Sequence, residues 1–324
     1  MRRLIAMLLA VMMVMTLVAC GSTKQEQAEG PFTGVDDGVL TVGMECAYAP
    51  YNWTQTDDSN GAVKISNVNG AYANGYDVTF APKITVGKAG SGLHIHMRIM
   101  KDGNNQMLKN GVISETARRA IAGMMKLAPS ITAFGNQNPT SYLRLVPHQE
   151  APTNVCWGDR NRSVLVRVPL GWASKTDLCK IANPNEKGTS YDTHQKQTVE
   201  MRSPDASANV YLLMAGLCVA CRYGLSLKDG LKVAEQTYVN VNIHKKENAK
   251  LLSKLDTLPD SCWASADCLA KQRKVYEEFG VFSPAMIDGI IDQLKAFKDK
   301  TLRAQVTKSK TAMQKLVKTY FYCG

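Results

Sequence analysis

Apolar and polar residues follow regular spacings in several parts of the chain. Short apolar or alternating runs predict strands over residues 38–44, 94–96, 164–167 and 199–202. A continuous apolar stretch predicts a buried helix over 211–220, and we expect Ser203, Pro204 and Asp205 to open it. Ser283 and Pro284 predict the start of another helix, whose apolar positions are Met286, Ile287, Ile290 and Ile291.

The last predicted helical region carries most of the clustered positive charge. The chain has 324 residues, enough for two domains, and a formal net charge of +11. Lysine and arginine are scattered except over residues 295–318, where they alternate with apolar positions. These positions are Leu294, Phe297, Leu302, Val306, Met313 and Leu316. The pattern predicts an amphipathic helix with a solvated face and does not favour a nucleic-acid partner.

The N-terminus resembles a bacterial lipoprotein leader. Arg2 and Arg3 precede an apolar run from residue 4 to 18 that is short for a membrane span. The run ends Leu-Val-Ala-Cys-Gly, which makes Cys20 the expected lipidation site. We therefore expect a signal peptide over 1–20, a polar linker over 21–36, and export with lipid anchoring at the membrane. An uncleaved membrane anchor is the alternative.

Eight further cysteines show no compact disulfide framework. Cys218 and Cys221 form a Cys-x-x-Cys pair, a spacing found in redox and zinc sites. They lie at the end of the apolar stretch, which favours the interpretation that both are core residues. The remaining cysteines are typical of a reduced, cytosolic protein, and this conflicts with the leader.

Charged residues on the predicted strands offer candidate chemistry. His94 and His96 lie two apart, as do Glu200 and Arg202, so each pair faces one side of its strand. Imidazole and carboxylate can share Mg²⁺ or Mn²⁺ at a nucleotide site. Three arginines lie close together within residues 160–167, and their guanidinium groups can bind phosphate or carboxylate through paired hydrogen bonds. For His94 and His96, the alternative is a half-buried strand that happens to carry two histidines. For the arginines of 160–167, the alternative is a solvated basic turn.

Residues 37–84 resemble the start of a type-3 extracellular solute-binding protein. The resemblance rests on the strand over 38–44, the aromatic loop over 48–53 and the Gly-Tyr-Asp-Val segment at 75–78. It implies that Tyr48, Tyr51 and Trp53 pack on an amino acid. The alternative function is thus a lipid-anchored amino-acid-binding component of an ABC transporter.

Residues 87–324 resemble the C-terminal part of the glutamine synthetase catalytic domain. Four motifs occur in order, at residues 90–97, 138–152, 160–169 and 199–209. The resemblance implies an α+β fold, in which curved antiparallel strands of an incomplete barrel carry the site and helices pack behind them. It also implies that ATP and Mg²⁺ or Mn²⁺ serve as cofactors, that glutamate and ammonium are substrates, and that the protein is a homo-oligomer.

The resemblance assigns a role to each matching residue. His94 and Glu200 match metal ligands, and His96 matches a contact to ATP phosphate. The residues that match glutamate-binding positions are Gly90, Arg144 and Arg202. Arg162 and Arg167 match residues on the transferred phosphoryl group, and Glu150 matches the flap glutamate that helps deprotonate ammonium.

The sequence departs from that family in ways that bear on activity. Ala89 stands where an asparagine often precedes the Gly-Ser-Gly turn. The family's ATP-contacting basic residue after Arg167 cannot be aligned, and Lys175, Lys180, Lys187 and Lys196 are the candidates. Upstream of Gly87 there is no Glu-x-Glu pair, and the β-grasp domain is missing. We therefore expect little or no synthetase activity and interpret the chain as a chimera.

Overall fold

The computed structural model describes residues 79–84, 88–147, 149–169, 185 and 193–322, together with five two-residue strands before residue 74. The chain divides into two compact units, Met1–Asp77 and Val78–Gly324. The first unit has a β1–β2 pair and a three-stranded sheet of order β3-β5-β4, all antiparallel. Their bounds are Val35–Asp36, Val39–Leu40, Thr54–Gln55, Val63–Lys64 and Tyr72–Ala73.

Several expectations for the first unit lie outside the described residues. These are the leader, the lipidation site Cys20 and the aromatic residues Tyr48, Tyr51 and Trp53. Of the strand predicted over 38–44, only Val39–Leu40 is described.

The second unit is built on a four-stranded sheet of order β11-β12-β13-β6. The strands are Ile95–Met97 (β6), Trp157–Asp159 (β11), Val166–Val168 (β12) and Val199–Met201 (β13). β12, β13 and β6 pair antiparallel, whereas β11 pairs with β12 in parallel. Two short hairpins follow β6: Met100–Lys101 with Asn104–Asn105 (β7 and β8), and Leu108–Lys109 with Val112–Ile113 (β9 and β10).

Helices fill most of the remaining described chain. The longer ones are Glu115–Gly135 (α2), Val210–Ser226 (α5), Cys262–Glu277 (α8), Pro284–Ala296 (α9) and Lys310–Thr319 (α11). The shorter ones are Ser141–Arg144 (α3), Gly230–Gln236 (α6), Ala249–Leu252 (α7) and Leu302–Thr307 (α10), with 3₁₀ turns Thr193–Lys196 (η2) and Lys246–Asn248 (η3).

Helix α2 is the central helix of this unit. The Ser114 side chain caps it by accepting a hydrogen bond from the Ala117 amide, which satisfies one of the free N–H groups of the first turn. α2 packs closely on α5 because Gly123 has no side chain. A Cβ at this position would lie 1.9 Å from the Ala220 carbonyl oxygen of α5.

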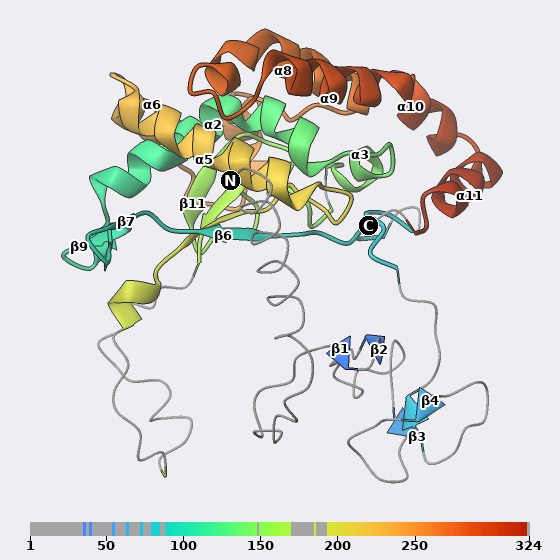
Figure 1. The fold of residues 1–324 in the computed structure, drawn as a ribbon, viewed down its shortest axis with the longest axis horizontal. Helices are drawn as coiled ribbons and strands as arrows, with labels where there is room; N and C mark the ends of the chain where they lie inside the picture. The colour runs from blue at the N-terminus through green and yellow to red at the C-terminus, as the bar shows by residue number, and fades with distance from the viewer. Residues whose placement is uncertain are drawn as a thin grey trace, which may run out of the picture. The chain divides into compact units, whose positions relative to one another are not determined.

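One apolar core joins the sheet to the helices. Ile121 and Phe134 of α2, Leu213 of α5, and Val166 and Met201 of the sheet belong to the same buried cluster. Figure 1 shows the helices gathered on one side of β6 and β11, with α8 and α9 beyond α2 and α5. The α+β prediction is confirmed, and the described strands form no closed barrel.

The predicted start of the apolar helix is wrong. Helix α5 begins at Val210, and the Asn209 side chain caps it by accepting from the Tyr211 and Leu212 amides. Asp205 instead accepts from the Ser207 amide and hydroxyl. Because the Asp205 carboxylate accepts these hydrogen bonds in a local turn, it does not cap a helix there, and α5 begins only at Val210. At the second predicted start, Ser283 caps α9 and Pro284 opens it, as expected.

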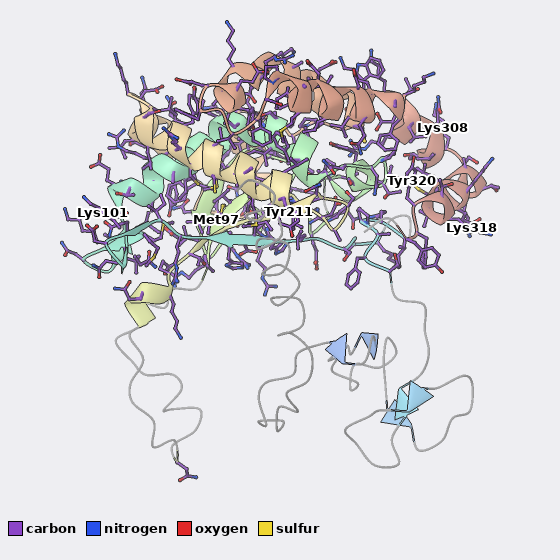
Figure 2. The ribbon with its side chains drawn as sticks, in the orientation of Figure 1. Met97, Lys101, Tyr211, Lys308, Lys318 and Tyr320 are labelled. Carbon is purple, nitrogen blue, oxygen red and sulfur yellow. The ribbon has the colours of Figure 1, made fainter. Side chains whose placement is uncertain are left out.

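The C-terminal amphipathic region is interrupted rather than continuous. Lys298 has a φ of 52°, which ends the helical path after α9, and α10 and α11 follow as separate helices. Val306, Met313 and Val317 are nevertheless buried together with Leu143. Lys308 and Lys318 project outward from this end of the unit (Figure 2), so the solvated lysine face is confirmed.

The five cysteines within the described residues are free thiols. Cys221 lies in the apolar helix as expected, and burial raises the pKa of its thiol to about 12. Cys218 is exposed, which corrects the prediction that both are core residues. Among the described residues no single helix is long and apolar enough to cross a membrane. Helices α5 and α6 meet the length and composition requirement only when taken together, and the pair is bent by 111° at the break between them.

Candidate active site

The face of the sheet opposite the helices carries the charged residues of the site. Ile95, Met97, Val199 and Met201 point to the apolar core, so their neighbours point to the other side. On that side Glu200 lies directly opposite His96 on β6 and directly opposite Arg167 on β12. The register therefore places the Glu200 carboxylate and the His96 imidazole opposite each other on adjacent strands, as the sequence predicted for one carboxylate and one imidazole.

Glu200 is a buried carboxylate held by cationic groups. Its side chain is 1% exposed. Arg167 contacts Oε2 twice, through Nε at 2.7 Å and Nη2 at 2.6 Å. Oε1 lies 2.7 Å from His94 Nδ1 and 3.6 Å from Arg202 Nε. We call the side chains of Glu200, Arg167, His94 and Arg202 the Glu200 cluster. Contact through two guanidinium nitrogens makes the Arg167–Glu200 pair a strong, charge-assisted one.

His94, which belongs to the cluster, and His96, which does not, differ in their partners although both are exposed. Burial lowers the pKa of His94; Glu200 opposes this, while Arg202, Arg144 and Arg167 add to the lowering. His94 is therefore biased toward the neutral imidazole, the form that can ligate a cation. His96 lies at the exposed surface, with Nδ1 3.0 Å from the Thr198 hydroxyl. That contact fixes the ring and leaves the imidazole open to solvent.

Glycines before β6 allow an arginine to pass beneath the turn. A Cβ on Gly92 would lie 2.3 Å from Nη2 of Arg144, and one on Gly90 would lie 2.2 Å from the Pro82 carbonyl oxygen. The two glycines of the Gly-Ser-Gly sequence are thus needed for the close packing of Arg144, whether or not they also contact a ligand.

Arg144 is 3% exposed and holds the chain next to the cluster. Its Nη1 donates to the Ser203 carbonyl at 2.7 Å and its Nη2 to the Arg202 carbonyl at 3.1 Å. Asn136 donates to the same Ser203 carbonyl and to the Asp205 carboxylate. Burial raises the pKa of Asp205, opposed by hydrogen bonds from Ser207, by the charge of Arg144 and by Asn136.

Arg202, Arg162 and Glu150 surround the cluster. Arg202 is 6% exposed and donates through Nη1 to the Val164 and Arg162 carbonyls. Burial lowers the pKa of Arg202, as do the charges of Arg167 and Arg162, whereas Glu200 and Glu150 raise it. The Arg162 and Glu150 side chains are exposed. Every predicted site residue in the second unit is thus described, and all but His96 are linked to the cluster or its supports by a contact or by charge.

Among the described residues the donors suited to a metal are His94 and Glu200. Oε1 of Glu200 is buried and has no hydrogen-bond partner of good geometry, which fits a cation ligand next to the His94 imidazole. The described residues contain no group of three or more histidines, cysteines or acids that could hold a metal ion. The pair therefore supplies part of a coordination shell, and magnesium sites commonly complete theirs with water and substrate phosphates.

Comparison with known proteins identifies the family. The model of the glutamine synthetase catalytic domain matches residues 35–314. The chain belongs to the glutamine synthetase catalytic domain family. The matched range begins ahead of residue 87 and includes the segment that resembles a solute-binding protein.

Curated relatives agree with the glutamine synthetase assignment. The chain is 35% identical over 211 residues to the glutamine synthetase of Thermococcus kodakarensis, covering 65% of this chain and 42% of the relative. It is 36% identical over 220 residues to that of Pyrococcus furiosus, covering 67% and 43%. The chain thus spans less than half the length of these relatives.

A solved structure shares the fold of this part. The chain aligns with a cryo-electron-microscopy structure of Plasmodium falciparum glutamine synthetase at a TM-score of 0.51 and 22% identity, over 72% of this chain and 48% of that one. This likeness supports the fold of the catalytic domain.

Sequence reasoning left some supporting residues unassigned. Thr198, Asn136 and Asp205 orient His96 and the segment that Arg144 holds. Thr198 lies two residues before Glu200, so strand alternation could have placed it on the site face. Of the four candidate ATP-contacting lysines, Lys196 is described; the other three lie outside the described residues.

Proposed function

We propose that this chain binds glutamate and the transferring phosphoryl group of ATP in a glutamine synthetase-type site. The reaction such a site serves is ATP-dependent ligation of ammonia to the γ-carboxylate of glutamate through γ-glutamyl phosphate. The observation that carries the proposal is the Glu200 cluster, in which a buried carboxylate and two arginines share one sheet face with His94.

The charge of the cluster suits anionic substrates. Arg167, Arg202 and Arg162 bring three positive charges to a site whose nearby acids are Glu200 and Glu150. We propose that Arg162 and Arg167 hold the transferring phosphoryl group and that Arg202, with Arg144 and Gly90, holds glutamate. Fixed guanidinium groups stabilise charge that spreads over the phosphoryl oxygens in the transition state.

The remaining residues take the roles that their positions allow. His96, exposed on β6 and directly opposite Glu200 on β13, is proposed to donate to an ATP phosphate oxygen. Glu150 is proposed to accept a proton from ammonium. His94 and Glu200 are proposed to ligate Mg²⁺ or Mn²⁺, which when bound neutralises charge on the phosphate groups.

We further propose that the chain by itself has little or no synthetase activity. The two donors offer an incomplete coordination shell, and the sequence ahead of residue 87 contains Glu26, Glu29 and Glu45 but no Glu-x-Glu pair. Phosphoryl transfer would then lack the carboxylates that position the cation.

Binding and turnover test the two parts of the proposal separately. Isothermal titration of the full chain with L-glutamate and with ATP plus Mg²⁺ should show binding. Arg167→Ala should weaken ATP binding at least about tenfold, because a charge-assisted hydrogen bond is lost. Arg118→Ala removes an exposed arginine of α2 and serves as the matched control.

The outcomes are distinct. Absence of binding to both compounds contradicts the proposed function. Production of glutamine at ordinary enzyme rates contradicts the proposed impairment and supports the function. Assembly into a homo-oligomer, proposed from the family, is read from the mass in solution by light scattering.

The leader supports a separate proposal about location. We propose that residues 1–20 direct export and that Cys20 becomes lipidated, with a solute-receptor fragment over 37–84 as the alternative source of function. Cys20→Ser should release the protein from the membrane fraction of a bacterial host. An unchanged distribution contradicts the anchor.

A further inference from the structure

Helix α5 carries apolar side chains on the face turned away from the core as well as on the face that packs against α2. Tyr211 is 84% exposed, Met214 57% and Leu225 41%, and Cys218 is exposed between them. Figure 2 shows where Tyr211 lies at the start of this face. We call the side chains of Tyr211, Met214, Cys218 and Leu225 the α5 stripe, because positions three, four and seven apart share one side of a helix.

The composition of α5 is that of a helix with partners on every side. Leu213 and Leu217 belong to the buried core, and Arg222 is the only charged residue in the sequence of α5. A helix that is apolar all round is normally buried all round. Exposed apolar patches mark contact surfaces, and tyrosine and methionine are enriched at protein interfaces. The α5 stripe therefore has the composition of a protein interface.

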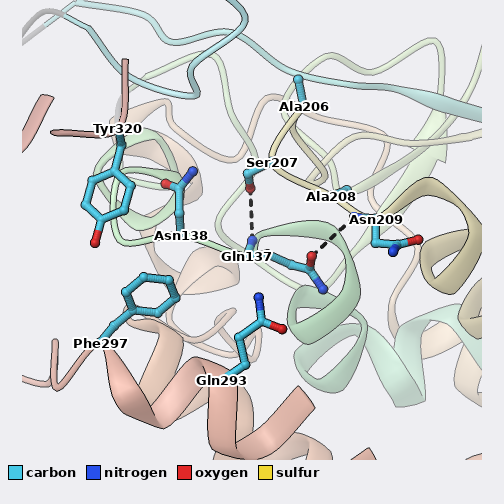
Figure 3. A pocket seen from close by; sticks show the side chains of 9 residues that line it. All are labelled: Gln137, Asn138, Ala206, Ser207, Ala208, Asn209, Gln293, Phe297 and Tyr320. Carbon is cyan, nitrogen blue, oxygen red and sulfur yellow. Dashed lines mark hydrogen bonds between the residues drawn. The ribbon is translucent and has the colours of Figure 1, made fainter. Parts of the chain in front are cut away.

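Contacts at both ends hold the stripe in place. The Asn209 side chain accepts a hydrogen bond from the Tyr211 amide and so caps the helix. The Gln137 side chain accepts in turn from the Asn209 amide, as Figure 3 shows. At the other end the Arg222 guanidinium stacks on the Phe279 ring, 3.8 Å from its centroid. A surface held in this way loses little conformational freedom when a partner binds.

The residues on this face are placed symmetrically about Cys218. Met214 and Arg222 lie four residues before and after it, and the flanking pair, seven residues before and after, is Tyr211 and Leu225. Two copies of α5 can therefore pack antiparallel with Cys218 at a two-fold axis. Met214 of one copy then lies level with Arg222 of the other. The two Arg222 side chains stay about 12 Å apart along the helix axis, so the pairing brings no like charges together.

We propose that the α5 stripe binds the same stripe on a second copy of this chain. Each large side chain of the stripe presents roughly 150 to 250 Å² when fully free. Because several of them are about half exposed on each copy, the contact buries on the order of 1,000 Å², near the lower end for specific interfaces. The dimer is therefore expected to be weak and to exchange with the monomer, so Cys218 stays reactive in dilute protein.

Sedimentation velocity of the full chain from micromolar to millimolar concentration measures the association. Met214→Lys brings a second positive charge level with Arg222 of the other copy and should raise the dissociation constant at least about tenfold. Met214→Glu brings a carboxylate to the same place and should weaken the dimer less than Met214→Lys does. Met286→Lys changes an exposed methionine of α9 outside the stripe and should leave the constant unchanged.

The thiol at the two-fold axis offers a second measurement. Diamide oxidises two thiols to a disulfide and takes up both of their hydrogen atoms. At concentrations where the dimer forms, this treatment should give a covalent dimer that Cys218→Ser removes and that Cys268→Ser, in α8, retains. Labelling of Cys218 by iodoacetamide should also slow as the protein concentration rises.

Three outcomes overturn the contact. A chain that stays monomeric at every concentration has no such dimer. Association that Met214→Lys and Cys218→Ser leave unchanged, in variants that circular dichroism shows to be folded, uses another surface. Binding of the monomer to phosphatidylcholine vesicles that Met214→Lys abolishes would assign the stripe to a membrane. The contact does not involve the Glu200 cluster, so its loss leaves the proposed function intact.

Discussion

Glu200 shows how one residue sets the charge balance of the site. Its buried carboxylate faces Arg167, Arg202 and His94, so it acts as the counter-ion that lets arginines stay packed beneath the sheet face. Removing one member of a buried ion pair is costly because the partner is left uncompensated.

Glu200→Gln should therefore destabilise the fold. We expect a loss of about 3 kcal/mol in the free energy of unfolding, since Arg202 would keep a buried charge without its acid. Urea unfolding followed by circular dichroism measures the change. Glu115→Gln, in an exposed pair with Arg119, should change it by less than about 0.5 kcal/mol. Equal effects of the two variants would show that Glu200 does not act as the counter-ion.

The Cys218–Cys221 pair makes a second prediction for individual residues. Burial raises the pKa of Cys221 to about 12, and the nearby Cys218 adds to it, whereas Cys218 itself is exposed. Because the thiolate is the reactive form, iodoacetamide near pH 8 should modify Cys218 in the folded protein and spare Cys221. Mass spectrometry of peptides from native and urea-treated protein measures the ratio. Equal labelling of both cysteines in native protein would contradict this assignment.

Among secondary-structure elements, the contact between α2 and α5 fixes the helical side of the core. Gly123 allows the approach, because a Cβ there would clash with the Ala220 carbonyl oxygen and the Gly224 backbone of α5. Gly123→Ala should destabilise the protein by about 3 kcal/mol, because the backbones must separate.

Gly289 provides the matched glycine in a helix. A Cβ there meets nothing within 4 Å, so Gly289→Ala in α9 should stabilise by about 0.5 to 1 kcal/mol through helix propensity. Thermal unfolding of both variants measures the contrast. A stable Gly123→Ala protein would mean that α2 and α5 can separate at little cost.

The strands and helices also show which features of the fold could be predicted from sequence patterns. Two-residue alternation at His94, His96 and Glu200 predicted a shared face, because strand pairing leaves little choice once one face is apolar. The start of α5 was misplaced because Asp205 has two competing partners, the next turn and Asn136, and the second is distant in sequence. The break at Lys298 had no glycine or proline to signal it.

For the whole molecule, the sequence predicted the family but could not place every supporting contact. The motifs lie in the right order, yet the role of Arg144 depends on carbonyl groups of Arg202 and Ser203, more than fifty residues away. Backbone acceptors carry no side-chain signature, so the packing role of Arg144 became visible only in three dimensions.

The division into two units makes a last prediction about the whole chain. Residues 78–324 contain the Glu200 cluster, the sheet that carries it and the apolar core joining that sheet to α2, α5, α8 and α9. A protein beginning at Val78 should therefore fold alone, with an unfolding midpoint close to that of the full chain, because the buried surface that stabilises it lies within one unit. Calorimetry of both proteins measures the midpoints, and titration with ATP plus Mg²⁺ measures whether the site survives. A fragment that fails to unfold cooperatively would show that residues 1–77 contribute to the core. A fragment that folds but loses ATP binding would place part of the site in the first unit, and the interpretation of this chain as a chimera would then be wrong.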